Sequence, residues 1–311
     1  MSDKNVLQDL FSQQNLDYLN QVPYNVARQT LYCAAELFDS PFFEQCHDSV
    51  VYRHVVATDK VSPSPVELWA RTVHDYHIRL AMHSFLRGYE RNKVVGIMGG
   101  HQLKRSDPMY RLVVTVAKSL TEQGYLMISG GGPGAMEATH LGAWLAGRPA
   151  PDVDVALSIL GVAQCYADDG WLESSLDVIS RLPQLYDFQS LSVPTWFYGH
   201  EPPTAFATHI AKFFDNSVRE DTILTEAYGG LVFMPGSAGT LQEIFQEAVQ
   251  DHYVSLGYPS PMIFVGSDFW QNKIPVYPFM TRMLQTGQYK NLLLTLADSA
   301  PEVIKAVVEF A

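Results

Sequence analysis

Two glycine-rich segments, about a hundred residues apart, have the composition of anion-binding turns. They are residues 129–138 (SGGGPGAMEA) and residues 234–243 (MPGSAGTLQE). Each follows a short apolar run and opens a stretch with the apolar spacing of a helix. A strand that passes through glycines into a helix presents unpaired backbone N–H groups at the positive end of the helix dipole. Two such segments predict a pocket built around a phosphate group, and the second brings a carboxylate, Glu243, one turn into its helix.

The chain from residue 93 onward predicts the elements that position these segments. Short apolar runs alternate with helical patterns, which is typical of an α/β fold with a doubly wound, Rossmann-like parallel sheet. In such sheets ligands bind beyond the carboxyl ends of the strands, where the strand order reverses. Both glycine segments belong at that edge. The predicted strands are 94–98, 125–129, 153–160, 193–198, 231–234 and 262–265, and the predicted helices are 106–124, 133–145, 204–227, 240–253 and 301–310.

The first 90 residues differ in composition, because they contain no glycine before Gly88. Helical patterns cover 26–38, 66–74 and 76–87, with Ser64 and Pro65 as the expected N-cap and first helical residue. We therefore expect a helical N-terminal extension, residues 1–90, and a Rossmann-like nucleotide-binding domain, residues 91–311. Residues 163–190 fit no pattern and form either a loop over the site or a helical excursion at a subunit contact.

The bulk composition narrows the class of protein. Hydrophobic residues make up 47% of the 311 residues and charged residues 17%, as in an ordinary folded protein with a sizeable core. The net charge of −12 disfavours a general nucleic-acid or anionic-membrane partner. Three widely spaced cysteines, Cys33, Cys46 and Cys165, favour free thiols in a reducing compartment. Without a signal-like N-terminus or a run of about 18 apolar residues, the chain is expected to be soluble and cytoplasmic.

Each glycine segment also has an interpretation without a ligand. The first satisfies the loose dinucleotide pattern G-x-G-x-x-A, but it follows the second predicted strand, and Asp152 and Asp154 lie at the wrong end of the next one. It can equally be a turn where glycine lets a helix pack closely on a strand. In the second, Thr240 and Glu243 have the spacing of a capping box, in which the carboxylate folds back to the backbone N–H of Thr240. The direction of the Glu243 carboxylate decides between capping and chemistry.

Together the two segments resemble the signatures of the LOG family, the "lonely guy" phosphoribohydrolases and related nucleotide 5'-monophosphate nucleosidases. Residues 235–243 resemble its PGGxGTxxE motif, and residues 130–138 resemble its GGGxxGxM motif in a form closer to the longer bacterial nucleosidase branch. Gly99 and Gly100, with Tyr110 beyond them, and Glu201 with two prolines are similar to further parts of that pattern. The resemblance covers roughly residues 93–310.

The resemblance implies hydrolysis of the N-glycosidic bond of a nucleoside 5'-monophosphate to free base and ribose 5-phosphate. It implies Arg219 and Glu243 as catalytic residues, no metal, no cofactor, and a homodimer or higher homo-oligomer. Two departures favour the alternative of a nucleotide-binding sensor or carrier without chemistry: Ser237 replaces a glycine, and Glu220 stands where a lysine is usual. The implied substrate-binding residues are Gly99, Gly100, Gly131, Gly132, Gly134, Met136, Glu137, Gly236, Ser237, Ala238, Gly239 and Thr240.

The expected mechanism centres on a ribosyl cation. Glu243, as a carboxylate that needs no raised pKa, would stabilise positive charge at C1' and orient or deprotonate the attacking water. Backbone N–H groups of residues 236–240 would hold the 5'-phosphate, and Arg219 would bind ribose or phosphate. Residues 131–137 would line the ribose and base. The aromatic residues 196–198 either stack on a base or belong to the core.

Overall fold

The computed structural model describes residues 12–40 and 42–310, and within them seven parallel strands form one sheet in the order β4-β3-β2-β1-β5-β6-β7. Successive strands run outward from β1 to β4, and the chain then returns to the other side of β1 with β5. This confirms the predicted doubly wound α/β fold and places the reversal between β1 and β5. The strands are β1 Val94–Met98, β2 Leu126–Ser129, β3 Ser190–Ser192, β4 His209–Ile210, β5 Gly230–Phe233, β6 Pro261–Val265 and β7 Leu293–Ala297.

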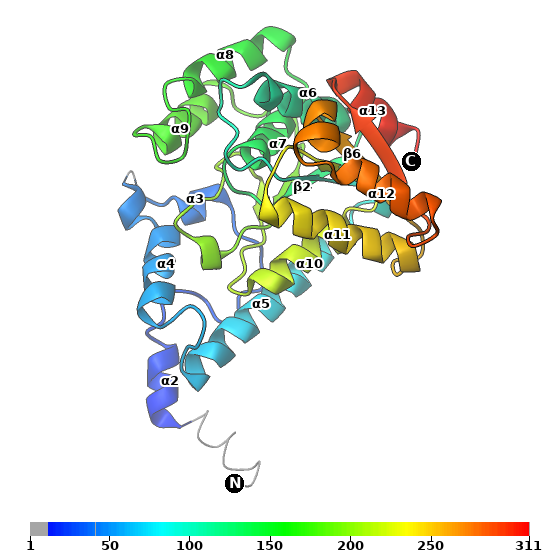
Figure 1. The fold of residues 1–311 in the computed structure, drawn as a ribbon. Coiled ribbons are helices and arrows are strands. Elements are labelled where there is room, and N and C mark those ends of the chain that lie inside the picture. Colours follow the sequence, from blue (N-terminus) through cyan, green and yellow to red (C-terminus); the bar gives the residue numbers. More distant parts are fainter. Residues whose placement is uncertain (1–11, 41, 311) are drawn as a thin grey trace.

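Alternate residues of each inner strand enter different cores, because successive side chains of a strand point to opposite faces. In β1, Val95 and Ile97 join one buried cluster with α6, α7 and α13, whereas Val94 and Met98 join a second cluster with α5, α10, α11 and α12. The helices of the first face are α6 Pro108–Glu122, α7 Ala135–Trp144, α8 Ala150–Leu160, α9 Trp171–Arg181 and α13 Ala300–Val308. Those of the second are α5 Pro65–Leu86, α10 Asn216–Glu226, α11 Ala238–Tyr253 and α12 Val276–Gln285 (Figure 1).

The N-terminal part shares the second core. Tyr32 is 2% exposed and pairs with Ile210 of β4 through two backbone hydrogen bonds of 2.9 and 2.8 Å. As predicted, Ser64 caps α5 and Pro65 is its first residue. The helices predicted over 66–74 and 76–87 are one continuous helix, and the predicted helix over 26–38 is wrong except for its last residues. The N-terminal helices are α2 Gln13–Leu19, α3 Ala34–Leu37 and α4 His47–Ala57, with short turns η1 Phe43–Gln45 and η2 Arg91–Lys93.

Three further predictions of local structure are wrong for identifiable reasons. The run 153–160 is helix α8 rather than a strand, because Val153, Ala156 and Leu160 are buried at helical spacing. Residues 193–198 follow the short strand β3 and end in η3 Trp196–Tyr198, and the helix predicted over 204–227 is reduced to α10 because β4 interrupts it. β7, α12 and the turn η4 Phe269–Lys273 were not expected from the sequence.

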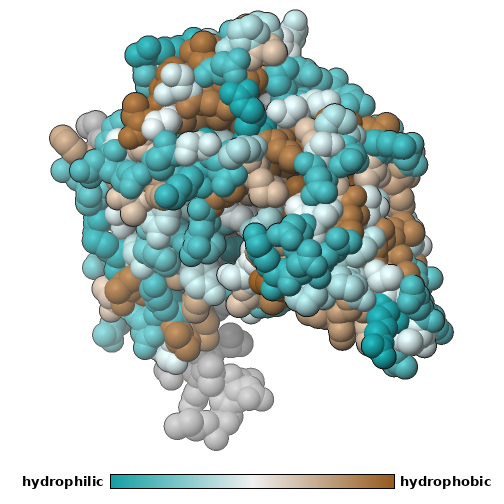
Figure 2. All heavy atoms as spheres, turned by 45° about the horizontal axis from the view of Figure 1, so that its top comes forward, coloured by the Kyte–Doolittle hydropathy of each residue, from teal (hydrophilic) through white to brown (hydrophobic). Residues whose placement is uncertain are grey.

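Within the part of the chain described, none of the helices combines the length and apolarity needed to cross a bilayer. Figure 2 shows hydrophilic residues over most of one face, with hydrophobic residues in separate patches between them. Scattered apolar patches of this kind are normal on folded proteins.

Candidate functional site

The carboxyl end of β1 lies between the two glycine segments. A Cβ on Gly99 would lie 2.8 Å from the carbonyl oxygen of Met234 and 2.8 Å from Oγ1 of Thr240, both in the second segment. A Cβ on Gly100 would lie 2.9 Å from Cβ of Ala135, in the first segment. Both glycines have positive φ, +82° and +69°, so a side chain would be strained as well as crowded. The structure therefore brings the two segments, distant in sequence, to one point of the sheet edge.

The first segment is held by internal hydrogen bonds. The N–H of Gly131 donates to Oγ of Ser129 (3.1 Å), and the N–H of Ala135 donates to the carbonyl of Gly100 (3.1 Å). The Ser129 hydroxyl is itself fixed by Nε2 of His140 at 2.8 Å. A Cβ on Gly134 would lie only 2.2 Å from the Gly100 carbonyl oxygen. Close packing of strand and helix thus accounts for much of this segment, although among the described residues the N–H groups of Gly132, Gly134, Met136 and Glu137 have no hydrogen-bond partner.

The second segment leaves its donors free. α11 begins at Ala238 after the N-cap Ser237, whose side chain makes no capping hydrogen bond. Within residues 12–40 and 42–310, the N–H groups of Ala238, Gly239 and Thr240 have no hydrogen-bond partner. Residues 237–239 are exposed, and a Cβ on Gly239 would meet nothing within 4 Å. Because residues 130–135 of the first segment are buried, the free N–H groups that open the sixteen-residue helix α11 form the more accessible anion site of the two.

Glu243 does not cap its own helix. Because α11 starts at Ala238, Thr240 is the third helical residue and not the N-cap, so the spacing of the capping box starts from the wrong residue. The Thr240 hydroxyl packs toward Gly99 and Gly236 instead. Oε2 of Glu243 is buried without a hydrogen-bond partner among the residues described. The capping interpretation is therefore wrong, and the carboxylate is available.

Arg219 reaches the same place from α10. Asp215 caps that helix by accepting the N–H groups of Ser217 (2.8 Å) and Val218 (3.2 Å). The Arg219 side chain extends toward the first segment, where a Cβ on Gly130 would lie 3.6 Å from its Nη1. Its Nε is buried and, within the described chain, has no hydrogen-bond partner. Arg219 and Glu243 thus each present an unsatisfied buried polar atom, although they form no ion pair with one another in the described residues.

The electrostatics couple the two side chains. Burial raises the pKa of Glu243 to about 7, the charge of Arg219 opposes this rise, and Glu220 adds to it. Burial lowers the pKa of Arg219, while the negative groups around it, first Glu243 and then Glu220, raise it. The carboxyl of Glu243 therefore titrates near neutral pH, where general acids and bases are effective.

Two further groups lie near the arginine: Tyr198, one of the aromatic residues expected either to stack on a base or to belong to the core, and Glu201, expected only through its place in the resemblance. The charge of Glu201 raises the pKa of Arg219, after the larger contributions of Glu243 and Glu220, and Oε2 of Glu201 would lie 3.8 Å from a Cβ on Gly132. Glu220, in the place of the family lysine, accepts hydrogen bonds from Asn216 (2.8 Å) and Gln242 (2.7 Å). The sequence signal for Glu201 was its position in the family resemblance. Its approach to the first glycine segment could not be predicted, because the loop that carries it follows that segment by about 70 residues.

Glu137 and Met136 have structural partners. Glu137 is fully buried, with Nε of Arg105 at 2.9 Å and the hydroxyl of Tyr110 at 2.8 Å. Met136 packs beneath the first segment, since Cβ atoms on Gly130 and Gly132 would meet its side chain at 2.8 and 2.9 Å. The charge of the Glu137 carboxylate is thus neutralised by Arg105. Glu137 also borders a cavity of about 350 Å³.

The described residues contain no cluster of three or more His, Cys, Asp or Glu side chains placed to hold a metal ion. The cysteines Cys33, Cys46 and Cys165 are free thiols.

Comparison with known proteins finds similarity in structure alone. No family model matches the chain, and no curated protein matches it. The X-ray structure of TM1055 is 18% identical, with 70% of this chain and 97% of that chain covered at a TM-score of 0.43. The molybdenum cofactor binding protein from Rippkaea orientalis (12%, TM-score 0.41) and the molybdenum cofactor carrier protein from Chlamydomonas reinhardtii (14%, TM-score 0.42) are each covered over 96% of their length and 70% of this chain. The fold class of this protein rests on its own sheet topology.

Proposed function

We propose that this protein hydrolyses the N-glycosidic bond of a nucleoside 5'-monophosphate, releasing the base and ribose 5-phosphate. The observation that carries the proposal is that Oε2 of Glu243 is buried and has no hydrogen-bond partner among the described residues, one turn beyond the free N–H groups that open α11, with Arg219 approaching the same edge. The reaction needs an anchor for the phosphate, an anion near C1' and a cation to balance the charge. These three groups are what the edge of the sheet offers.

In the proposed complex, the 5'-phosphate of the substrate binds at the start of α11. Its oxygens accept the N–H groups of Ala238, Gly239 and Thr240, which otherwise lack partners. Glu243 follows Thr240 by three residues, or about 4.5 Å along the helix axis at 1.5 Å per residue. The sugar of a nucleotide held by its phosphate therefore extends along α11 toward the carboxylate. Holding C1' beside Glu243 in this way is the main catalytic contribution of the fold.

The chemical step exchanges one bond for another. The bond from C1' to the base nitrogen breaks with its electron pair going to the base, and the ribosyl cation that develops is stabilised by ionised Glu243. A water oxygen bonds to C1' and gives its proton to Glu243. The departing nitrogen gains a proton, so the overall reaction adds one water. A carboxyl with a pKa of about 7 is suited to receiving that proton near neutral pH.

The direct test is incubation with a panel of purine and pyrimidine nucleoside 5'-monophosphates, followed by chromatography for free base. We expect Glu243→Gln to bind nucleotide with little change and to lose turnover by 100-fold or more, roughly the contribution of a positioned acid–base group. Glu173→Gln, an exposed change on α9, is the matched control and should leave turnover unchanged. Turnover retained by Glu243→Gln contradicts the role of Glu243.

A second candidate is a nucleotide-binding protein without chemistry. It is favoured by Glu220, whose charge raises the pKa of Glu243 and so increases the neutral fraction of the carboxyl that would have to stabilise a cation. Ser237 is less of an obstacle than its position suggested, because it is exposed and its φ of −118° is ordinary for a residue with a side chain. Saturable binding of a monophosphate without release of base, in the same assay, selects this candidate.

A further inference from the structure

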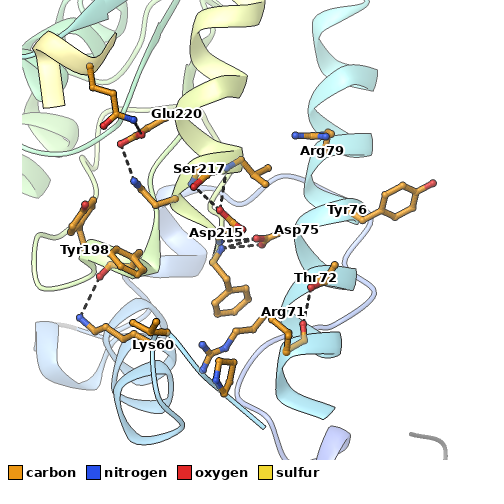
Figure 3. A pocket seen from close by; sticks show the side chains of 18 residues that line it. Lys60, Arg71, Thr72, Asp75, Tyr76, Arg79, Tyr198, Asp215, Ser217 and Glu220 are labelled. Carbon is orange, nitrogen blue, oxygen red and sulfur yellow. Dashed lines mark hydrogen bonds between the residues drawn. The ribbon is translucent and has the colours of Figure 1, made fainter. Parts of the chain in front are cut away.

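A cavity of about 740 Å³ lies between α5 on one side and η3 and the first turn of α10 on the other (Figure 3). Its volume is within the range of small-molecule sites, about 300–1,000 Å³. Glu220 and Gln242 border it, but their chain neighbours Arg219 and Glu243 do not. The hydrogen bond from Gln242 to Glu220 (2.7 Å) therefore forms part of the wall between this cavity and the site at the sheet edge.

The acidic side chains of the cavity are already occupied. Asp75 accepts the backbone N–H groups of Phe214 (2.9 Å) and Asp215 (2.9 Å), as Figure 3 shows. Asp215 caps α10, and Glu220 accepts two side-chain amides. Because each carboxylate has hydrogen-bond donors within the protein, the cavity has little unmet demand for a cation.

Two cationic side chains of the cavity keep free donors. Arg79 forms no hydrogen bond or ion pair within the described residues, although burial raises the pKa of Glu226 on α10 and Arg79 is among the cations whose charge lowers it. Figure 3 shows the Arg79 guanidinium on the side of α5 that faces α10. Lys60, across the cavity, donates to Tyr52 (3.1 Å) and to the carbonyl of Phe197 (3.3 Å), which leaves one of its three N–H bonds unused. Arg71, by contrast, is engaged by Glu67, as well as by partners in residues 58–59.

The remaining walls are apolar and partly aromatic. Phe197, Tyr198 and Phe214 line one side and Leu68 the other, and Tyr198 and Leu68 are 45% and 55% exposed. Aromatic faces of this kind stack on planar rings. Free cationic donors beside aromatic walls suit a ligand that combines a planar ring with an anionic group.

We propose that this cavity is a second ligand site, separate from the start of α11, that takes a planar organic anion of nucleotide size. The anionic group pairs with Arg79, and the ring extends across the cavity to lie against Phe197 and Tyr198, beside Lys60. A ligand there contacts Glu220 and Gln242, whose neighbours in the chain are Arg219 and Glu243. Ligand binding in the cavity is therefore linked to the site at the sheet edge through two pairs of adjacent residues, Arg219–Glu220 on α10 and Gln242–Glu243 on α11.

The test is the number of AMP molecules bound per chain, measured by equilibrium dialysis in the Glu243→Gln background so that no substrate is consumed. Two variants separate the sites. Arg79→Gln removes the cation of the cavity, and Gly239→Asp places a negative charge in open space at the start of α11. Arg87→Gln, an exposed arginine at the end of the same helix α5, is the control for Arg79. Circular dichroism establishes that each variant is folded.

We expect two AMP per chain, with one lost in Arg79→Gln, the other lost in Gly239→Asp, and both kept in Arg87→Gln. Affinity at the cavity should fall at least tenfold in Arg79→Gln. One AMP per chain, lost in Arg79→Gln and kept in Gly239→Asp, supports the cavity and contradicts the proposed phosphate site. AMP binding that Arg79→Gln leaves unchanged, or no binding at all, overturns the inference.

Discussion

Arg219 and Glu243 lie on different helices, α10 and α11, and each carries a buried polar atom, Nε and Oε2, without a hydrogen-bond partner among the residues described. An unsatisfied buried polar group costs about 1–3 kcal/mol, and more when it is charged. A fold that keeps two of them at one sheet edge, near free N–H groups, gives up stability that a polar ligand restores when it binds.

The pH dependence of turnover tests the role of Glu243. Since burial raises its pKa to about 7, we expect kcat/KM to rise with pH and to level off above about pH 7, because the ionised form stabilises the ribosyl cation. The profile of each monophosphate should be compared with a substrate analogue whose phosphate does not titrate in this range. A rate that instead falls above pH 7 would assign Glu243 the role of general acid toward the leaving base.

Gly239 tests the phosphate anchor. Gly239→Ala fills open space in the first turn of α11, keeps the N–H groups and should leave KM within about twofold, with stability equal or higher by about 0.5–1 kcal/mol. Gly239→Asp brings a negative charge to the same point and should raise KM at least tenfold through repulsion of the phosphate. Steady-state kinetics and thermal unfolding of the pair separate charge from folding. Equal KM values for both variants would place the phosphate elsewhere.

Ser237 tests whether the departure from the family motif matters. Its φ of −118° is negative, so the backbone does not require glycine at this position, and its side chain is exposed. Ser237→Gly should change kcat/KM by less than about threefold and should lower stability by less than about 1 kcal/mol through greater freedom of the unfolded chain. A large gain of activity in this variant, measured with the same monophosphates, would show that the serine side chain obstructs the site.

Glu137 tests a structural role against a substrate contact. It is fully buried between Arg105 and Tyr110, so Glu137→Gln leaves the arginine without its counter-charge. We expect the free energy of unfolding to fall by about 3–5 kcal/mol, the usual effect of breaking a buried ion pair. Urea unfolding measures it, with Glu173→Gln as the exposed control. A fully stable variant with a raised KM would instead indicate that Glu137 contacts the substrate.

The burial of the Glu247 carboxyl predicts an unusual dependence of stability on pH. It is fully buried on α11 with neither carboxylate oxygen hydrogen-bonded in the described structure, and burial followed by the charge of Asp251 raises its pKa well above 4.5. The folded state therefore holds this proton more tightly than the unfolded state, and the group's contribution to stability declines as pH rises above 4.5. Glu247→Gln should be more stable than the natural chain by about 1–3 kcal/mol at pH 8 and no more stable at pH 4. Urea unfolding at the two pH values gives the difference, and a gain of equal size at both would contradict it.

The sequence predicts the parallel sheet and the edge of the site because both depend on local patterns. Glycines after apolar runs identified the carboxyl ends of β2 and β5, and the reversal of strand order then placed them near Gly99 and Gly100. Pattern alone did not separate strand from helix in residues 153–160, a short apolar run that fits both. The half-buried edge strand β7 gave too weak an alternation to be found.

Several contacts within the site join distant residues, and no local pattern shows them. Glu137 was expected to bind substrate because of the family resemblance, and its ion pair with Arg105, 32 residues away in the sequence, lies beyond any local pattern. The capping interpretation of Glu243 failed because α11 starts two residues before Thr240, which only the packing of Thr240 against Gly99 and Gly236 makes evident.

The backbone pairing of Tyr32 with Ile210 has a consequence for truncation of the chain. β4 is the last strand on its side of the sheet, and the segment around Tyr32 satisfies the N–H and C=O groups that Ile210 turns outward. Exposed strand edges are templates for pairing between molecules, and natural proteins cover them to prevent aggregation. The N-terminal segment thus covers β4 at Ile210, and a shortened chain that begins after residue 40 would leave the backbone N–H and C=O of Ile210 open to pairing with another molecule.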